Sequence, residues 1–139
     1  MALDPQQALF TALLLRLREL HPKDVYDTFL PPKGTPYPFI YIGNSTMIDD
    51  FGNKTQILGT VDQTFEVWHD DPMKRGTVSA LLGEIKKVCY EVQRTNGFSW
   101  SVDAVTQNIL PDNSTGTPLL HGLLTVTFRL LGGQDEDYI

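Results

Sequence analysis

Apolar residues recur at intervals of three and four near the start of the chain, the spacing of one face of an α-helix. They are Leu9, Phe10, Leu13, Leu14, Leu17 and Leu20. Asp4 suits the N-cap and Pro5 the first helical position, so we predict a helix from there to His21. Leu15 lies nearly opposite the stripe and is predicted to be exposed, which makes it a candidate partner contact.

The same periodicity predicts a second helix in the middle of the chain. Its buried positions are Val78, Leu81, Leu82, Ile85, Val88, Cys89 and Val92. Asp71-Pro72 is suited to capping the start of this helix. Asn96-Gly97 supplies a left-handed stop after it.

Strict alternation of apolar and polar residues predicts three β-strands, each with one buried face. They cover residues 61–67, 98–104 and 124–130, and Ala104 falls on the buried side. A fourth strand is predicted at residues 39–43, which are β-branched and aromatic. The polar segment 44–54 is predicted to be a long loop, and residues 111–114 a turn.

These elements predict an α+β fold: an antiparallel-rich sheet of about four strands with two helices packed on one face. The other sheet face would carry Thr, Ser, Glu and Arg with Trp68 and Leu123 among them, a composition suited to solvent or to a wet protein interface. We expect a single domain over residues 1–133. Residues 134–139 are expected to form a flexible acidic tail.

Composition narrows the classes of partner. The chain has 139 residues, with 17 acidic against 11 Lys and Arg and a net charge of −6, which disfavours ordinary nucleic-acid binding. Cys89 is its only cysteine, so neither an intrachain disulfide nor a four-cysteine metal site can form. The apolar stretch 8–17 is too short to span a bilayer, so no membrane segment is expected.

No pattern of residues predicts catalysis. Phosphate-binding glycine loops are absent, and residues 97–101 (GFSWS) lack the final glycine of a hydrolase nucleophile turn. The three histidines are scattered rather than paired on a helix, and Asp49-Asp50 lacks the spacing of a calcium loop. We therefore predict no catalytic, cofactor-binding or metal-binding residue, and no enzyme.

Four stretches, taken together, carry a family resemblance: VYD (25–27), PYPFIYIG (36–43), FEVWHD (65–70) and GLLTVTFR (122–129). Their order and spacing resemble the tail-completion, or tail-to-head joining, proteins of long-tailed bacteriophages and prophages, also called tail terminators. The similarity covers nearly the whole chain. No single motif is specific, but the succession is.

The resemblance implies a virion structural protein that caps the finished tail tube as a hexameric ring and docks onto the head connector. Its partners would be other copies of itself, the major tail tube protein and a head-completion protein, with DNA passing through unbound. It would be located at the head-proximal end of the tail, and in the host cytoplasm during assembly. No cofactor is implied, and an acidic ring would repel DNA phosphates.

Exposed loops supply the remaining candidate contacts. They are Asp49, Asp50, Phe51 and Lys54 in the predicted loop, and Asp112 and Asn113 in the predicted turn. Phe51 could anchor a partner pocket or fold back onto its own core. Two other functions stay open: a cellular ligand-binding or adaptor domain, which a deep apolar pocket would favour, and a small hydrolase.

Overall fold

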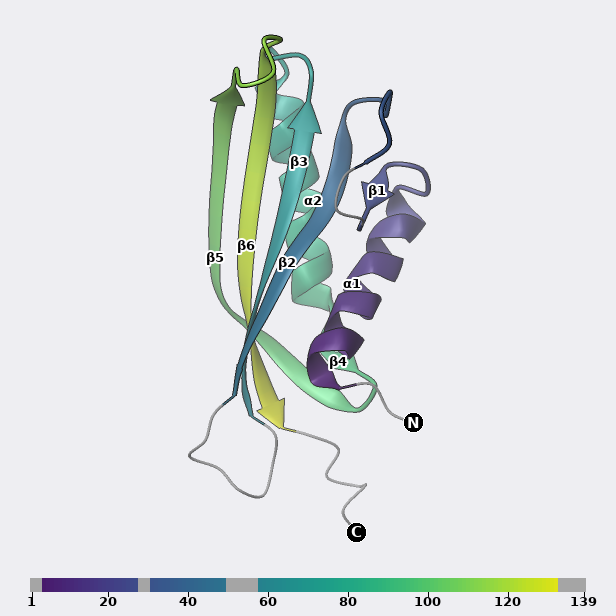
Figure 1. The fold of residues 1–139 in the computed structure, drawn as a ribbon. Helices are drawn as coiled ribbons and strands as arrows, with labels where there is room; N and C mark the ends of the chain where they lie inside the picture. The colour runs from purple at the N-terminus through teal and green to yellow at the C-terminus, as the bar shows by residue number, and fades with distance from the viewer. Residues whose placement is uncertain (1–3, 28–30, 50–57, 133–139) are drawn as a thin grey trace.

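The computed structural model describes residues 4–27, 31–49 and 58–132. They form one sheet and two helices (Figure 1). In chain order the elements are α1 (Pro5–Leu20), β1 (Val25–Tyr26), β2 (Phe39–Asp49), β3 (Gly59–His69), α2 (Arg75–Glu91), β4 (Arg94–Thr95), β5 (Phe98–Asp112) and β6 (Leu119–Gly132).

The sheet has six strands in the order β1-β2-β3-β6-β5-β4. β1 pairs with β2 in parallel, and the other neighbours pair antiparallel. The prediction of about four strands in an antiparallel-rich sheet was therefore wrong: the strands form one mixed, curled sheet. β1 and β4 have two residues each, which is too short for a period of two to appear in the sequence.

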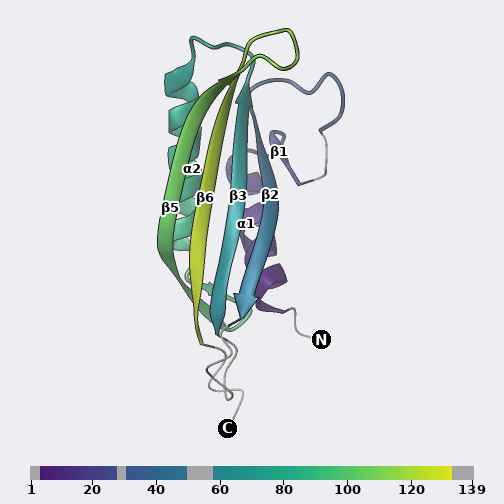
Figure 2. The ribbon, with the colours of Figure 1, turned by 60° about the vertical axis from the view of Figure 1, so that its left-hand side comes forward.

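Both helices lie on the same side of the sheet, and Figure 2 shows β5, β6, β3 and β2 in front of them. α1 begins where Asp4 Oδ1 accepts the backbone N–H groups of Gln6 and Gln7, at 2.9 and 3.2 Å. Beneath the helices lies the core, in which the largest fully buried side chains include Phe65 of β3 and Phe128 of β6. The apolar stripes of the two helices are thus directed at one sheet face.

Helix α2 packs closely against β6 at Gly122. A Cβ atom at this position would lie 2.7 Å from Val78 Cγ1 and 3.1 Å from Leu82 Cδ1, both on α2. Neither partner can easily retreat, because both side chains are fully buried. The glycine therefore sets the distance between helix and sheet.

Two β-bulges explain where the strand predictions were wrong. In β2, the register shifts between Ile42 and Ser45, and the strand continues to Asp49 through residues predicted to be loop. In β5, the shift between Val102 and Ala104 turns Ala104 to the exposed side, although alternation predicted it to be buried. A bulge inserts one residue and so exchanges the faces of all residues that follow.

The predicted ends of α2 also differ from the structure. The helix begins at Arg75 without a side-chain cap, whereas Asp71 Oδ1 accepts the Met73 N–H in the preceding turn, at 2.9 Å. The left-handed residues Asn96 and Gly97 do not stop the helix, which ends at Glu91. They form the tight turn between β4 and β5, for which Asn-Gly is the preferred pair.

Two glycine substitutions should have opposite effects on stability. Gly122→Ala forces a methyl group against Val78, which should lower the free energy of unfolding by about 1–3 kcal/mol. Gly83→Ala lies in α2 with open space around it, so it should raise the free energy of unfolding by about 1 kcal/mol. Urea unfolding followed by circular dichroism measures both. Equal effects of the two variants would contradict the close approach at Gly122.

Candidate interaction surface

The sheet face away from the helices, which we call the open face, is polar in its centre. Register places Thr64, Thr125 and Thr106 side by side there, on β3, β6 and β5. The same face carries Trp68 and Leu123, so its predicted mixed composition is confirmed. The fold leaves this face without a covering layer among the described residues, which makes it a candidate interaction surface.

One end of the open face holds a groove lined by aromatic side chains, which we call the aromatic groove. It has a volume of about 410 Å³ and lies beside the turn that joins β5 to β6. Its lining residues are Pro31, Tyr37, Phe39, Tyr41, Glu66, Trp68, Asp112, Ser114, Thr115 and Leu119. Such a concave apolar surface with a few polar groups is the usual form of a binding site.

Ring contacts build one wall of the aromatic groove. The rings of Tyr26 and Phe39 meet edge to face with centroids 5.7 Å apart, and those of Tyr37 and Phe39 are tilted at 5.4 Å. These residues come from β1, the segment before β2, and the start of β2. The parallel pairing of β1 with β2 places Tyr26 beside Tyr41 and thereby completes the wall.

The floor of the aromatic groove is a stack fixed by a hydrogen bond. The indole of Trp68 lies parallel to the His121 ring, with centroids 3.8 Å apart. His121 Nε2 lies 2.7 Å from Glu66 Oε1, and this contact holds the imidazole parallel to the indole. Trp68 and His121 are register partners on β3 and β6. The adjacent strands therefore orient the stack before any partner binds.

Asp112 closes the aromatic groove and orders the turn that follows it. Its Oδ1 accepts the backbone N–H of Ser114 at 2.9 Å and the hydroxyl of Ser114 at 2.6 Å. These two hydrogen bonds hold the pKa of the Asp112 carboxyl below its usual value, and the nearby His121 contributes a smaller lowering. The groove therefore keeps a negative charge at its rim.

Beyond the centre, the open face carries paired polar groups. The Thr127 hydroxyl donates to Asp62 Oδ1 at 2.6 Å, and Arg129 lies 3.1 Å from Asp103. Among the residues that the structure describes, the acidic side chains on this face outnumber the basic one, Arg129. The acidic side chains are Asp62, Asp103, Glu66 and Asp112. The face is thus acidic along its length and aromatic at one end.

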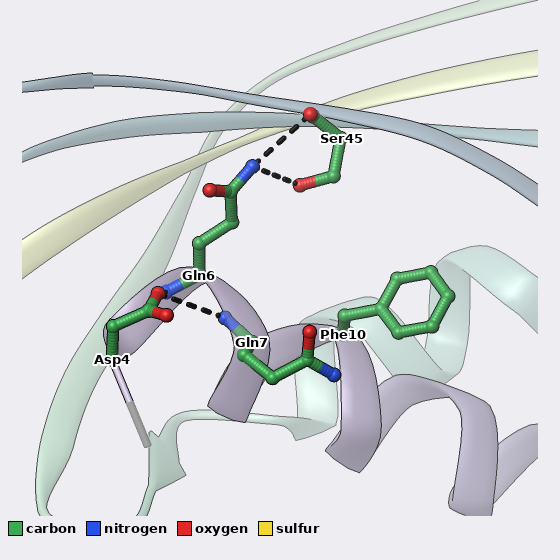
Figure 3. Close-up of a pocket in the computed structure, with 5 residues that line it drawn as sticks. All are labelled: Asp4, Gln6, Gln7, Phe10 and Ser45. Atoms are coloured by element: carbon green, nitrogen blue, oxygen red, sulfur yellow. Dashed lines mark hydrogen bonds between the residues drawn. The ribbon is translucent and has the colours of Figure 1, made fainter.

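A second hollow, of about 300 Å³, lies at the start of α1 (Figure 3). The Gln6 side chain reaches across it, and its Nε2 donates to the carbonyl oxygen of Ser45 at 3.0 Å and to the hydroxyl at 2.9 Å. Asp4 caps the helix, while Phe10 points away from the Gln6–Ser45 contact. Because its polar groups already bond one another, this hollow fastens α1 to β2 rather than offering free ligand groups.

The predicted contact residues do not lie together. Leu15 is 57% exposed on α1 and borders a groove between α1 and the end of α2. Asp49 is exposed at the end of β2, far along the sheet from the turn between β5 and β6 (Figure 1). Asp112 lines the aromatic groove and Asn113 is exposed beside it. Asp50, Phe51 and Lys54 lie outside the described residues.

Sequence reasoning missed the aromatic groove itself. Phe39 and Tyr41 alternate along β2 and so share one side of the strand, which was a usable signal. Tyr37 joins them from the segment before the strand. Trp68 was placed correctly on the open face. The pairing of Trp68 with His121 depends on strand register, which no local pattern supplies.

Metal-ligating side chains do not gather in the described part of the chain. No set of three or more His, Cys, Asp or Glu side chains is placed to hold a metal within residues 4–27, 31–49 and 58–132. Cys89 is buried, and burial raises the pKa of its thiol, so the reactive thiolate is suppressed. Among the helices in these ranges, none has the length and apolarity needed to cross a membrane.

Comparison with known proteins gives a structural match without a sequence match. No family model matches the chain, and no curated protein matches it. A solved structure, described as the virion of a native gene transfer agent particle, contains a chain with a similar fold. The TM-score is 0.61 at 17% identity, covering 91% of this chain and 93% of the other. At this identity the match establishes the shared fold.

The Asp112 carboxylate should make stability depend on pH. Because the pKa of Asp112 is lower in the folded state than in the unfolded chain, its stabilising contribution is complete at neutral pH. That contribution is lost as the pH falls through the folded-state pKa. Asp112→Ala should therefore lower the free energy of unfolding at neutral pH, and the difference from wild type should shrink in acid.

Urea unfolding at neutral pH and below the usual aspartate pKa measures this difference. Asp112→Asn is the matched control, because it keeps an oxygen acceptor for Ser114 but cannot titrate. A difference between wild type and Asp112→Ala that stays constant with pH would contradict the assigned role.

Proposed function

We propose that this chain is a non-enzymatic structural protein of a phage-like virion. It caps the tail tube as a hexameric ring, joins it to the head connector and lets DNA pass. One observation carries the proposal: a chain of the gene transfer agent virion has the same fold over nearly the full length of both chains. The sequence resemblance to tail-completion proteins points to the same class independently.

The charge of the molecule supports a DNA conduit. The net charge is −6, and acidic groups outnumber basic ones along the described open face. DNA phosphates are repelled by a surface of like charge within about a Debye length, roughly 8 Å at physiological salt. A ring of such subunits would let DNA slide without binding it.

The aromatic groove supports a docking role at one end of the ring. Tyr and Trp side chains supply large apolar areas with a polar tip, and they are enriched at protein interfaces. In the aromatic groove these side chains are held in place by ring contacts and by the Glu66–His121 pair before a partner binds. A preformed surface loses less conformational entropy on binding. We assign to it a segment of a neighbouring virion protein.

The location of the chain is the first test. Electron microscopy of purified tails carrying an epitope-tagged copy should show the tag as a single ring at the head-proximal end. When particles are produced from a genome that lacks this gene, tails and heads should accumulate without being joined. A tag spread along the tube, or normal joining without the gene, would contradict the proposal.

The second test removes the floor of the aromatic groove. Trp68→Ala should block head-to-tail joining while leaving the monomer folded, because Trp68 lies on the open face and outside the helix-covered core. Trp68→Phe keeps an aromatic ring to stack on His121 and should retain most joining. The fraction of tails that carry heads measures the effect, and circular dichroism checks the fold.

The runner-up function is a ligand-binding or adaptor domain outside a virion, which the volume of the aromatic groove also permits. The two functions differ in what fills the aromatic groove. Under the runner-up, a small molecule should change the fluorescence of Trp68 in the isolated protein, and tails should lack the chain.

A further inference from the structure

Each side of the sheet ends in a strand of two residues, so that long backbone edges of β2 and β5 have no strand beside them among residues 4–27, 31–49 and 58–132. β4 pairs with β5 only at Phe98 and Ser99, and β1 pairs with β2 only at Ile40 and Tyr41. Among the described residues, no strand covers β5 beyond Ser99 or β2 beyond Tyr41 on the outer side. Such edges are templates for pairing with another chain.

Hydrogen bonds at the start of β5 show which of its backbone groups point outward. The N–H of Trp100 donates to the carbonyl of Gln93 at 2.8 Å, outside the β5–β6 ladder. Successive residues of a strand direct their N–H and C=O to alternate sides. The bulge between Val102 and Ala104 inserts one residue, so odd-numbered residues point outward after it.

Two further features confirm this assignment for β5. Arg75 Nη2 on α2 donates to the carbonyl of Ile109 at 3.4 Å, which requires that carbonyl to face away from β6. Pro111 has no N–H, and an outward position on an edge is where a strand tolerates proline. Val105, Gln107 and Ile109 therefore direct their N–H and C=O groups outward.

The same alternation identifies the backbone groups of β2 that point outward. The N–H of Ile40 donates outward to the carbonyl of Asp24 at 2.8 Å. After the bulge, Ser45 is outward, as the bond from Gln6 Nε2 to its carbonyl shows (Figure 3). Met47 then points its N–H and C=O in the same direction. On each edge, a helix side chain thus bonds one outward carbonyl: Gln6 bonds that of Ser45 on β2, and Arg75 bonds that of Ile109 on β5. Other outward backbone groups of both edges are left open among the described residues.

We propose that these two edges bind each other between copies of this chain: the β5 edge of one copy pairs with the β2 edge of the next. The inference rests on the proposed function, because a ring requires two different surfaces per subunit that meet head to tail. β2 and β5 lie toward opposite sides of the sheet and run antiparallel to each other, so the joint continues the sheet as an antiparallel pair.

The composition of the two edges fits this pairing. Residues 104–110 of β5 carry no charged side chain, and in β2 the only charge within residues 45–49 is Asp49. Edges that avoid association usually carry lysine or an inward charge. Within one copy, the register across the sheet places Ser45 of β2 level with Val105 of β5. Between two copies, pairing of the two open segments instead places Met47 of one copy near Gln107 of the next. Neighbouring copies are then staggered, with strands tilted to the ring axis, as in a closed barrel.

Proline substitutions test each edge separately. Gln107→Pro removes an outward N–H from β5 and places a ring at the joint, but it breaks no bond to β6. Met47→Pro does the same on β2. The matched controls Gln107→Ala and Met47→Ala lose the same side chains and keep the N–H. Circular dichroism checks that all four fold, and sedimentation velocity gives their masses at rising concentration.

Wild type and both alanine variants should form the closed ring, and each proline variant alone should stay a monomer. An equal mixture of the two proline variants should form a heterodimer, because the intact β2 edge of one meets the intact β5 edge of the other. This dimer cannot grow, since its two outer edges both carry proline.

Three results would overturn the proposal. They are a ring formed by either proline variant, a homodimer of Met47→Pro through two β5 edges, and a wild-type chain that stays monomeric throughout. If the mixture behaves as expected but tagged tails show no ring, the edge pairing stands and the tail function fails.

Discussion

Packing of both helices against a single face of the sheet is the constraint on which the rest of the structure depends. Phe65 and Phe128 fill the centre of this layer, and Gly122 lets α2 come close enough to cover them. Since both helices cover one face, the side chains of the other face are exposed to solvent and must be suited to it. This accounts for the threonine-rich open face, because β-branched polar side chains fit an exposed sheet.

The helices and the two central strands could be predicted from the sequence, because each has one buried face with a regular period. The Asp4 cap of α1 was also identifiable, since capping depends on residues close in sequence. The short strands β1 and β4 could not be predicted, because two residues give no period. The bulges were also hidden: one inserted residue exchanges the faces of a strand without altering its composition, as Ala104 illustrates.

The candidate surface was predictable only in its parts. Asp112 was predicted to lie in a turn, but it ends β5, and the structure places it at the rim of the aromatic groove. Trp68 was placed on the open face, but its contact with His121 arises from the pairing of β3 with β6. Segments distant in sequence thus build the aromatic groove, whereas local patterns report only on neighbours. The predicted contact at Leu15 remains a prediction on a separate face.

The two ends of the open face differ in chemistry, and this difference affects how the molecule can be oriented against neighbours. One end presents stacked aromatic rings, and the other presents the Arg129–Asp103 pair. The molecule therefore has polarity along the strand direction, because the two ends of its open face differ in chemistry. In any axial stack, such a part can engage unlike neighbours above and below, and inverted insertion would set charged groups where apolar contact is needed. In the proposed ring, this difference between the two ends would fix the orientation in which each copy is inserted.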